Sequence, residues 1–535
     1  MPLPLAYYLF AGFFQIKYPG FYYDEAFQLL PAVNFAQENC NYPYLRILDL
    51  KIGNNRFPLM RHHYGGMVKA YPLAVVFKIF GVGWLVTRIT MIVLGLFILV
   101  LVYLWARQLF DIRVAFLALL LLSTDPNFIF PVRVDLGLVV LMLIFKMVSL
   151  LLLLRWWRKG GVLSFVMAFF SLGLGVWDKA NFFWFVGALI ASGFLVGGSG
   201  LFKKLTWGAL IGGVGAFILG SSPFSALNIM RSGVTFSRMV KPDPRTQRLL
   251  MEVGRNLSVS FRVFWQTING HWLQRIFIGS SPLHLFLPYL LGFSVIVFLG
   301  ISLKIIVAHR LRLKKVSFVF SLMTGILLLT MLTPQTWGGH HFLMVYPFPH
   351  IFCGAVLSSL ITLRSPRAAV RKVLSVMGIA VLLLAIYSNV SLTFAVHRAF
   401  ARDKLPWWAW SNAIYDLGDY LSNLPGKTIL CLDWGFYRNL AVVTEGKVKL
   451  EEKYENFRSG QADNVFKKCF PNNYYLYLLS HRPLFHQGRK SFEKALKDLG
   501  YQKRLERSFR DGRGKEIYFI FKVSPLADGE KKSHI

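Results

Sequence analysis

Long apolar runs separated by short polar breaks dominate the first 400 residues of the chain. An apolar run of about 20 residues is long enough for a helix to cross a bilayer, and the pattern predicts about eleven such spans. The predicted spans are residues 2–16, 84–105, 114–131, 136–154, 163–177, 182–198, 205–222, 283–307, 316–333, 342–362 and 373–391. The apolar stretch 71–83 is too short to cross and is typical of a helix lying at the membrane surface.

The pattern changes after residue 400. Residues 428–436 and 516–523 have the short apolar pattern of buried strands, and residues 491–501 have the period of an amphipathic helix. We therefore predict an α-helical polytopic membrane domain over residues 1–400, followed by a small α/β domain over residues 401–535.

The composition excludes a soluble enzyme and a disordered scaffold. The chain is 55% hydrophobic and only 16% charged, and its mean hydropathy is +0.48. Its net charge of +34 is typical of a nucleic-acid binder, but the first 400 residues hold 36 of the 60 Lys and Arg and only 10 of the 26 Asp and Glu. The basic excess thus lies mostly in the membrane part, where it sets topology or attracts anionic lipid, and we expect no nucleic-acid partner.

The basic residues of the membrane part gather in alternate short loops, where Asp111 is the one acid. These residues are Arg107, Arg113, Arg155, Arg158, Lys159, Lys203, Lys204, Arg310, Arg312, Lys314, Lys315, Arg364, Arg367, Arg371 and Lys372. Cytoplasmic loops carry this excess, so the long loops 17–83 and 223–282 and the C-terminal domain are predicted to be extracytoplasmic. The basic loop 223–282 either contacts anionic headgroups or gates an anionic substrate.

Asp24 and Glu25 form an acidic pair just after the first predicted span. Such a pair has two interpretations. It stabilises the start of the helix that follows, as N-cap and first-turn acids do. Alternatively, partial burial at the membrane surface makes one carboxylate a general base, because desolvation raises its basicity.

Six short motifs follow one another along the membrane part. They are Tyr23-Asp24-Glu25-Ala26, Tyr71-Pro72-Leu73 with Leu85-Val86-Thr87-Arg88, Leu104 to Phe110, Arg133-Val134-Asp135, Gly173-Leu174-Gly175 to Asp178-Lys179, and Gly339-His340-His341-Phe342 with Tyr346-Pro347. In this order the chain resembles the GT-C superfamily of membrane glycosyltransferases, in its protein O-mannosyltransferase and aminoarabinose-transferase-like branch. Three features depart from that pattern: an Asp precedes Lys179, the His340-His341 loop lacks the expected Arg, and the first span is short.

The resemblance implies a bacterial inner-membrane enzyme. Such enzymes move a sugar from a polyprenyl-phosphate donor to an extracytoplasmic hydroxyl of a lipid, glycan or protein, with inversion at the sugar carbon. Asp24 then matches the base, Glu25 orients the acceptor, and Asp135 is a second external acid, or else a salt-bridge partner of Arg133. The implied partners are the lipid-linked donor and membrane lipids, and a divalent metal is left open.

The same resemblance implies cationic groups for the donor phosphate. The candidates are Lys179, His340, His341, Arg133 and Arg88. Lys179 also fits a topological anchor at a span end, and the two histidines also fit an interface loop without a ligand. His62 and His63 are a further polar pair for an acceptor or metal contact, although two histidines alone cannot complete a tetrahedral site.

Two other functions fit the residues. A transporter or flippase for lipid-linked glycans would also be polytopic, but it would hold charged residues within its spans, where Lys146 and Lys304 are the chief examples. The second of these functions is that of an inactive homologue whose C-terminal domain binds a partner. The four cysteines have no metal-binding spacing, and Cys431 and Cys469 would pair only in an oxidising compartment.

Overall fold

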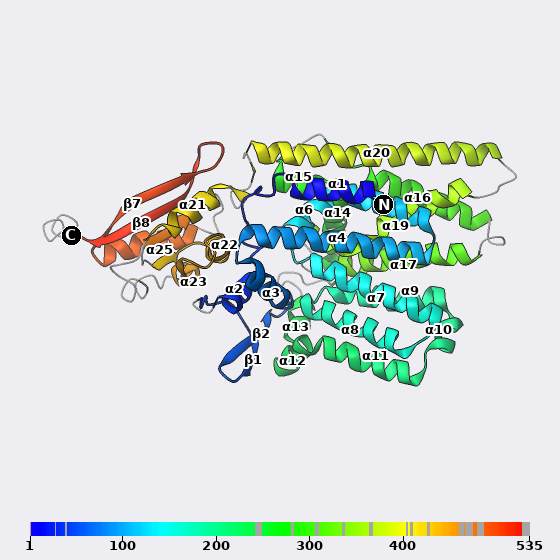
Figure 1. The fold of residues 1–535 in the computed structure, drawn as a ribbon, viewed down its shortest axis with the longest axis horizontal. Coiled ribbons are helices and arrows are strands. Elements are labelled where there is room, and N and C mark those ends of the chain that lie inside the picture. Colours follow the sequence, from blue (N-terminus) through cyan, green and yellow to red (C-terminus); the bar gives the residue numbers. More distant parts are fainter. Residues whose placement is uncertain are drawn as a thin grey trace.

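The computed structural model describes residues 2–26, 28–37, 40–240, 249–279, 283–304, 310–333, 338–362, 368–402, 405–406, 410–424, 428–459, 465, 474–478 and 486–526. Long helices lie side by side in the membrane part, and the C-terminal domain projects from one end of them (Figure 1). This arrangement confirms an α-helical polytopic protein with a small C-terminal α/β region.

Helices occupy all the predicted spans. Their bounds are α1 Pro2–Phe13, α4 Trp84–Leu109, α5 Ile112–Thr124, α6 Pro126–Arg133, α7 Val140–Lys159, α8 Val162–Asp178, α9 Phe182–Gly197, α11 Trp207–Gly220, α16 Leu287–Lys304, α17 Arg310–Leu332, α19 Phe348–Thr362 and α20 Ala368–Ala401. Within the described residues, four of these helices (α4, α7, α17 and α20) are long and apolar enough to cross a membrane alone. Three bent pairs raise that number to seven, so the membrane crossing is supported but the count of eleven stays a prediction.

Two predicted spans are broken rather than continuous. Helices α5 and α6 are bent by 62° relative to each other, with the break at Asp125-Pro126. The second break lies at Tyr346-Pro347. There, α18 (Gly339–Phe342) and the 3-10 turn η1 (Leu343–Val345) are bent by 43° relative to α19. Proline lacks an N–H and disfavours a helical residue before it, so it interrupts an apolar run that periodicity alone reads as one helix.

Buried polar side chains stabilise both breaks. Asp125 caps α6 through Asn127 N, and its other oxygen lies 3.0 Å from His350 Nε2. The Lys146 ammonium donates to the carbonyl oxygens of Met344, at 2.6 Å, and Tyr346. Lys146 therefore satisfies backbone groups that the second break leaves without helical partners, which is a structural use of a charge within a span.

The elements of the two long loops lie at the end of the molecule that carries the C-terminal domain (Figure 1). The first loop contains α2 Leu29–Ala36, the strands β1 Leu48–Ile52, β2 Asn55–His62 and β3 Gly65–Gly66, and α3 Ala70–Phe80. The second contains α12 Ser222–Met230, α13 Val234–Val240, α14 Leu249–Ile268 and α15 His271–Phe277, while residues 241–248 and 280–282 lie outside the described part. Helix α3 exposes Val75, Ile79 and Phe80, which fits the predicted surface helix.

The C-terminal domain is built on a five-stranded sheet of order β5-β4-β6-β8-β7. Its elements are α21 Ala413–Ser422, β4 Thr428–Cys431, α22 Tyr437–Val443, β5 Lys449–Glu452, α23 Tyr454–Arg458, β6 Tyr474–Leu478, α25 His486–Asp498, β7 Tyr501–Arg510 and β8 Glu516–Pro525. Strand β4 runs parallel to β5 and β6, and β8 runs antiparallel to β6 and β7. The predicted strands and helix are present. Cys431 is a buried free thiol, and Cys469 lies outside the described residues.

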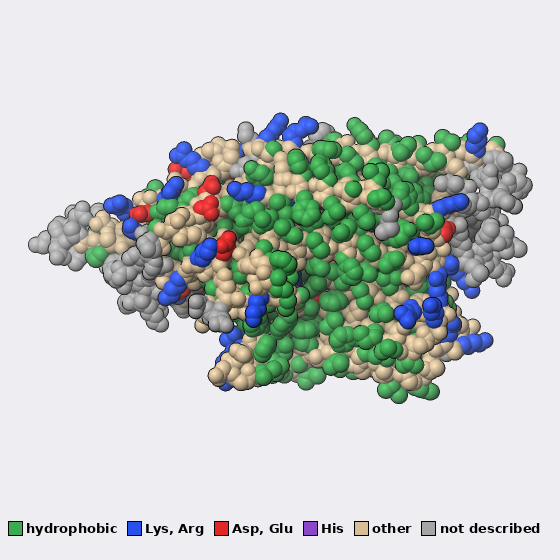
Figure 2. All heavy atoms as spheres, viewed as in Figure 1, with side chains coloured by type: hydrophobic (Ala, Val, Ile, Leu, Met, Phe, Trp, Pro, Cys, Tyr) green, Lys and Arg blue, Asp and Glu red, His purple; other side chains and the backbone are tan. Residues whose placement is uncertain are grey.

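On the face shown in Figure 2, the surface divides into an apolar middle and two polar ends. Figure 2 shows hydrophobic side chains covering the middle of the molecule, with Lys and Arg gathered at the end near α10 (Ser199–Lys204) and both signs of charge over the C-terminal domain. An apolar middle of this kind fits the hydrocarbon core of a bilayer. The placement of the α10 end in the cytoplasm and of the C-terminal domain outside stays a prediction.

The first half of the C-terminal domain packs directly on the first long loop. Gly20 N donates to Trp410 O at 2.8 Å, and the Tyr42 hydroxyl donates to Val448 O at 2.6 Å. Phe21 of the loop and Leu440 of α22 belong to the same hydrophobic core. The C-terminal domain is therefore part of the surroundings of Asp24 and Glu25, which lie in this loop.

Candidate functional site

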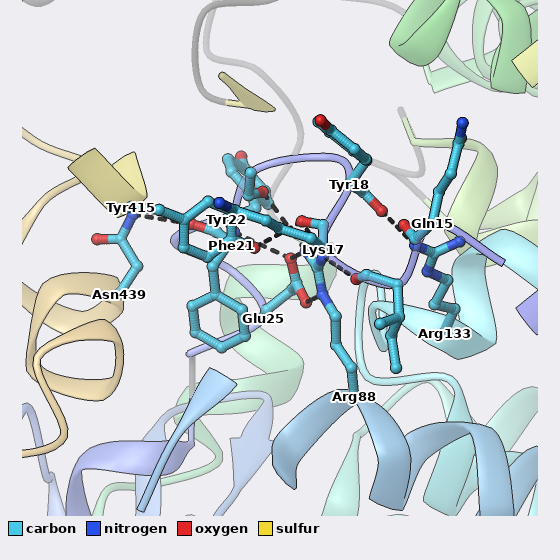
Figure 3. A network of polar contacts seen from close by, with 12 residues as sticks. Gln15, Lys17, Tyr18, Phe21, Tyr22, Glu25, Arg88, Arg133, Tyr415 and Asn439 are labelled. Carbon is cyan, nitrogen blue, oxygen red and sulfur yellow. Dashed lines mark hydrogen bonds and ion pairs between the residues drawn. The ribbon is translucent and has the colours of Figure 1, made fainter. Parts of the chain in front are cut away.

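A buried ion pair fixes the segment that leads from α1 to Asp24 (Figure 3). Arg88, on α4, contacts the Glu25 carboxylate with two nitrogens, at 3.0 Å and 2.7 Å, and both side chains are almost fully buried. Another Arg88 nitrogen donates to the carbonyl oxygens of Ile16, at 2.8 Å, and Lys17, at 2.9 Å. One guanidinium thus holds both ends of the turn, which is a task suited to the five fixed donors of arginine.

Arg133, at the end of α6, acts on the same segment. Its guanidinium donates to the carbonyl oxygens of Phe14, at 3.2 Å, Gln15 and Tyr18, and the side chain is fully buried (Figure 3). Arg133 and Arg88 were predicted as phosphate ligands. The structure instead brings both to the backbone of the loop, with Glu25 as the partner of Arg88.

The C-terminal domain contacts this segment from the other side. The Tyr415 hydroxyl donates to Lys17 O at 2.7 Å, and the Asn439 amide donates to Phe21 O at 3.1 Å (Figure 3). These bonds join α21 and α22 to a loop 398 and 418 residues earlier in the chain. Of the two neighbouring acids, Glu25 forms the ion pair with Arg88, and Asp24 takes no part in it.

Asp24 is half-buried, in the turn that precedes α2. Burial raises the pKa of its carboxyl, although a hydrogen bond with Tyr22 and the positive charges of Arg438 and Lys179 lower it in part. Arg438, on α22, lies 4.4 Å above the ring of Tyr23, whose hydroxyl donates to Glu452 at 2.7 Å. The helix-capping interpretation of the acidic pair is wrong, because α2 begins at Leu29 and its N-cap position is Gln28.

Lys179 lies at the centre of a buried polar cluster. It directly follows α8, and its ammonium donates to Gly137 O at 2.6 Å. Burial lowers the pKa of Lys179 to about 8, against the opposing effect of the negative charges of Asp178, Asp135 and Asp24. Because these charges act on one ammonium, Lys179 connects Asp24 with the second external acid, Asp135.

Asp135 is paired with Lys69 rather than with Arg133. The Lys69 ammonium lies 2.7 Å from Asp135 Oδ2, and each side chain is only 3% exposed. The other carboxylate oxygen accepts from Val140 N at 3.0 Å, at the start of α7. The predicted alternative of a salt bridge with Arg133 is therefore wrong. Lys69 was missed, although a lysine two residues before the Tyr71-Pro72-Leu73 motif, on the predicted face that carries the acids, was a usable signal.

The histidines approach the same lysine. Gly137 has a φ of +74°, and a Cβ there would lie 2.3 Å from the His340 ring, so the imidazole packs directly on this glycine. The rings of His340 and His341 are 4.3 Å apart, and Lys179 acts electrostatically on both. Burial, with His63 and Lys179, lowers the pKa of His62 to about 4.

The predicted residues thus fall into two groups. Asp24, Asp135, His62, His340 and His341 each interact electrostatically with Lys179. Glu25, Arg88 and Arg133 form the neighbouring buried network. His63 is in neither group, and its backbone oxygen accepts a hydrogen bond from the Thr235 hydroxyl. Among the described residues, no group of three or more His, Cys, Asp or Glu side chains is arranged to hold a metal ion.

Comparison with known proteins agrees with this architecture. Residues 65–225 match the family model of dolichyl-phosphate-mannose-protein mannosyltransferase. No curated protein sequence matches the chain.

Solved structures share the fold over nearly the whole chain. ArnT from Cupriavidus metallidurans in the apo state has a TM-score of 0.57 at 14% identity, and ArnT bound to undecaprenyl phosphate has a TM-score of 0.56 at 15% identity. Each match covers 97% of both chains. The Archaeoglobus fulgidus oligosaccharyltransferase in complex with Zn and sulfate has a TM-score of 0.51 at 14% identity, over 97% of this chain and 72% of that one. The predicted fold is therefore confirmed: the chain is a multi-pass membrane protein that shares the fold of ArnT, and its residues 65–225 are similar to the dolichyl-phosphate-mannose-protein mannosyltransferase family.

Proposed function

We propose that the protein transfers a sugar from a polyprenyl-phosphate donor to a hydroxyl group of an extracytoplasmic acceptor, with inversion at the sugar carbon. The observation that carries this proposal is a half-buried carboxylate, Asp24, beside a buried ammonium, Lys179, at one end of a membrane fold similar to ArnT. The similar structure of ArnT bound to undecaprenyl phosphate supports a lipid-phosphate carrier.

The reaction needs one base and one cationic site. Asp24 accepts the proton of the acceptor hydroxyl, whose oxygen forms a bond to the anomeric carbon. The bond from that carbon to the phosphate oxygen breaks, and polyprenyl phosphate leaves with the electron pair. A single displacement of this kind inverts the carbon. Lys179 and Lys69 stabilise the negative charge that grows on the departing phosphate, since a buried ammonium interacts strongly with charge in a site of low dielectric.

The protonation states suit these roles. The raised pKa of Asp24 makes its carboxylate a stronger base than an exposed one. Lys179, with a pKa of about 8, stays mostly protonated at neutral pH and donates hydrogen bonds to phosphate oxygens. His340 and His341 are assigned to the phosphate as hydrogen-bonding groups, and His62 and His63 to the acceptor side.

Glu25, Arg88 and Arg133 are assigned a positioning role. Their charged atoms are bonded to one another or to carbonyl oxygens of residues 14–18. They hold the turn that presents Asp24, and catalytic groups need such support because small displacements of a reacting group lower the rate steeply.

The test begins with lipid mass spectrometry on membranes of a strain that lacks the gene. A polyprenyl-phosphate sugar is expected to accumulate there and to disappear on complementation. The lipid extract of the deletion strain, reconstituted with the purified protein, should then lose the sugar-bearing lipid and release polyprenyl phosphate. A transporter would move the same lipid across the bilayer uncleaved. Unchanged lipids in every strain and in the reconstituted extract would contradict the transferase.

Arg438 provides a test of the electrostatics around Asp24. Its charge lowers the pKa of Asp24, so Arg438→Gln should raise that pKa and move the acid limb of the rate profile to higher pH. The groups that interact with Asp24 besides Arg438 are Tyr22, Tyr23, Tyr64 and Lys179, and these stay in place. The loss of activity is therefore expected to be larger at low pH than at high pH.

The matched control is Arg507→Gln. Arg507 lies 4.8 Å above the ring of Tyr420, in the same domain and in a similar stacked geometry, but it is not among the charges that act on Asp24. Arg438→Lys should restore most of the wild-type pH profile, because it restores the charge. A loss of equal size at every pH would show that Arg438 only stabilises the domain contact.

A further inference from the structure

Three side chains next to Lys179 carry buried polar atoms that lack a hydrogen-bond partner among the described residues. These atoms are Gln28 Oε1, Asp178 Oδ2, and Oδ1 and Nδ2 of Asn181. The three residues are 0%, 1% and 4% exposed. Buried polar groups are nearly always hydrogen-bonded in folded proteins, so a cluster of unpaired ones beside a reacting site points to a ligand that pairs with them.

Local contacts bring the three residues to the same short strand, β3. Asp178 and Asn181 flank Lys179 in the chain, and the backbone here lies against the short strand β3. Gly65 forms a bridge with Lys179, and Ala180 N donates to Tyr64 O at 2.9 Å.

Gln28 reaches the same strand from the other side of the loop. Its amide nitrogen donates to Gly66 O at 2.5 Å. Gly66 in turn packs so closely on α8 that a Cβ at this position would lie 2.0 Å from Trp177 O. Gln28 therefore contacts the same two-residue strand that packs on Trp177 and bridges to Lys179.

The hydrogen-bonding properties of these four atoms indicate which part of the donor they bind: the phosphate, the polyprenyl chain or the sugar. The two amides both donate and accept hydrogen bonds, and the Asp178 carboxylate accepts them. A phosphate would be repelled by Asp178, and a polyprenyl chain would leave all four atoms unpaired. Sugar hydroxyls donate and accept, so they match an amide and a carboxylate together.

We propose that Gln28, Asp178 and Asn181 form the subsite that binds the hydroxyl groups of the transferred sugar, next to the lysine that takes the donor phosphate. This proposal rests on the proposed function. It gives Asp178, which departs from the pattern of the resembling family, a role in sugar recognition. It also orients the donor, because the phosphate lies toward Lys179 and the sugar toward residues 178–181.

The test compares two lipids that differ only in the sugar. Purified protein is titrated with polyprenyl phosphate and with the sugar-bearing lipid isolated from the deletion strain. Asn181→Leu, which keeps the side-chain shape, should weaken binding of the sugar-bearing lipid about tenfold and leave the affinity for polyprenyl phosphate unchanged. Asp178→Asn is the second variant. It replaces the carboxylate, which only accepts hydrogen bonds, with an amide of the same shape, so a polar group stays in place.

The control is Ser294→Ala, which removes a buried unpaired polar atom far from the subsite in the chain, the hydroxyl of Ser294 on α16, and should change neither affinity. Equal weakening for both lipids in the two subsite variants would place their effect on the phosphate or the fold and overturn the subsite. Unchanged affinities would show that the unpaired atoms hold water only. Both of these outcomes overturn the subsite only, and the proposed function stands as long as the wild-type protein cleaves the donor. If the wild-type protein neither binds nor cleaves the donor, the proposed function itself is refuted.

Discussion

Asp24→Asn is expected to lower kcat/KM for sugar transfer by about 10² to 10⁴, the range that a general base contributes. The loss corresponds to about 3 to 5 kcal/mol of transition-state stabilisation. The amide keeps the shape of the carboxylate and cannot accept the acceptor proton. The measurement is the rate of polyprenyl-phosphate release by purified protein, with the donor varied at a fixed level of acceptor.

The stability of the same variant separates lost chemistry from lost folding. The pKa of Asp24 is raised in the folded protein, so the unfolded chain releases this proton at lower pH than the folded one. Ionised Asp24 consequently lowers the stability of the fold as the pH rises above the ordinary carboxyl pKa. Asp24→Asn removes this effect, and its melting temperature in detergent at pH 7 should equal or exceed that of the wild type.

Asp49→Asn is the matched carboxylate control. Asp49 lies on β1 in the same loop, at the surface, where it pairs with Arg46 and Arg56 at 3.3 Å. Its replacement should leave transfer nearly unchanged, since exposed ion pairs contribute little. Wild-type activity of an equally well folded Asp24→Asn protein would remove Asp24 from the role of base.

Arg88→Met is expected to produce the largest loss of stability. It leaves the Glu25 carboxylate buried without its cation, a change that costs about 3 to 5 kcal/mol when one partner of a buried pair is removed. It also leaves the carbonyl oxygens of Ile16 and Lys17 without their donor. The turn that presents Asp24 should loosen, so both the melting temperature in detergent and the transfer rate are expected to fall.

Two further variants identify the cause. Arg56→Met removes an exposed arginine that pairs with Asp49, and its effect should stay within about 1 kcal/mol. Adding Glu25→Gln to Arg88→Met removes the uncompensated charge, and the double variant should therefore be more stable than Arg88→Met alone. If the double variant is the less stable of the two, the ion pair is not what holds the turn.

The sequence alone determined the class of fold, because a bilayer imposes long apolar helices that are visible as runs in a single chain. Through the resemblance and their placement on one predicted face, it also led to the prediction that Asp24, Asp135 and Lys179 belong to one site. The strands and helix of the C-terminal domain were likewise predictable, since their periodicity is local.

The partners of those residues were decided only by the tertiary structure. Lys69 pairs with Asp135, Arg88 with Glu25, and Arg438 reaches Asp24 from a domain more than 400 residues away. Composition and periodicity report which segments are buried, but an ion pair depends on which side chains two distant segments bring within a few ångströms. The same limit explains the unpaired atoms near Lys179, because an unsatisfied hydrogen bond is defined only once all neighbours are in place.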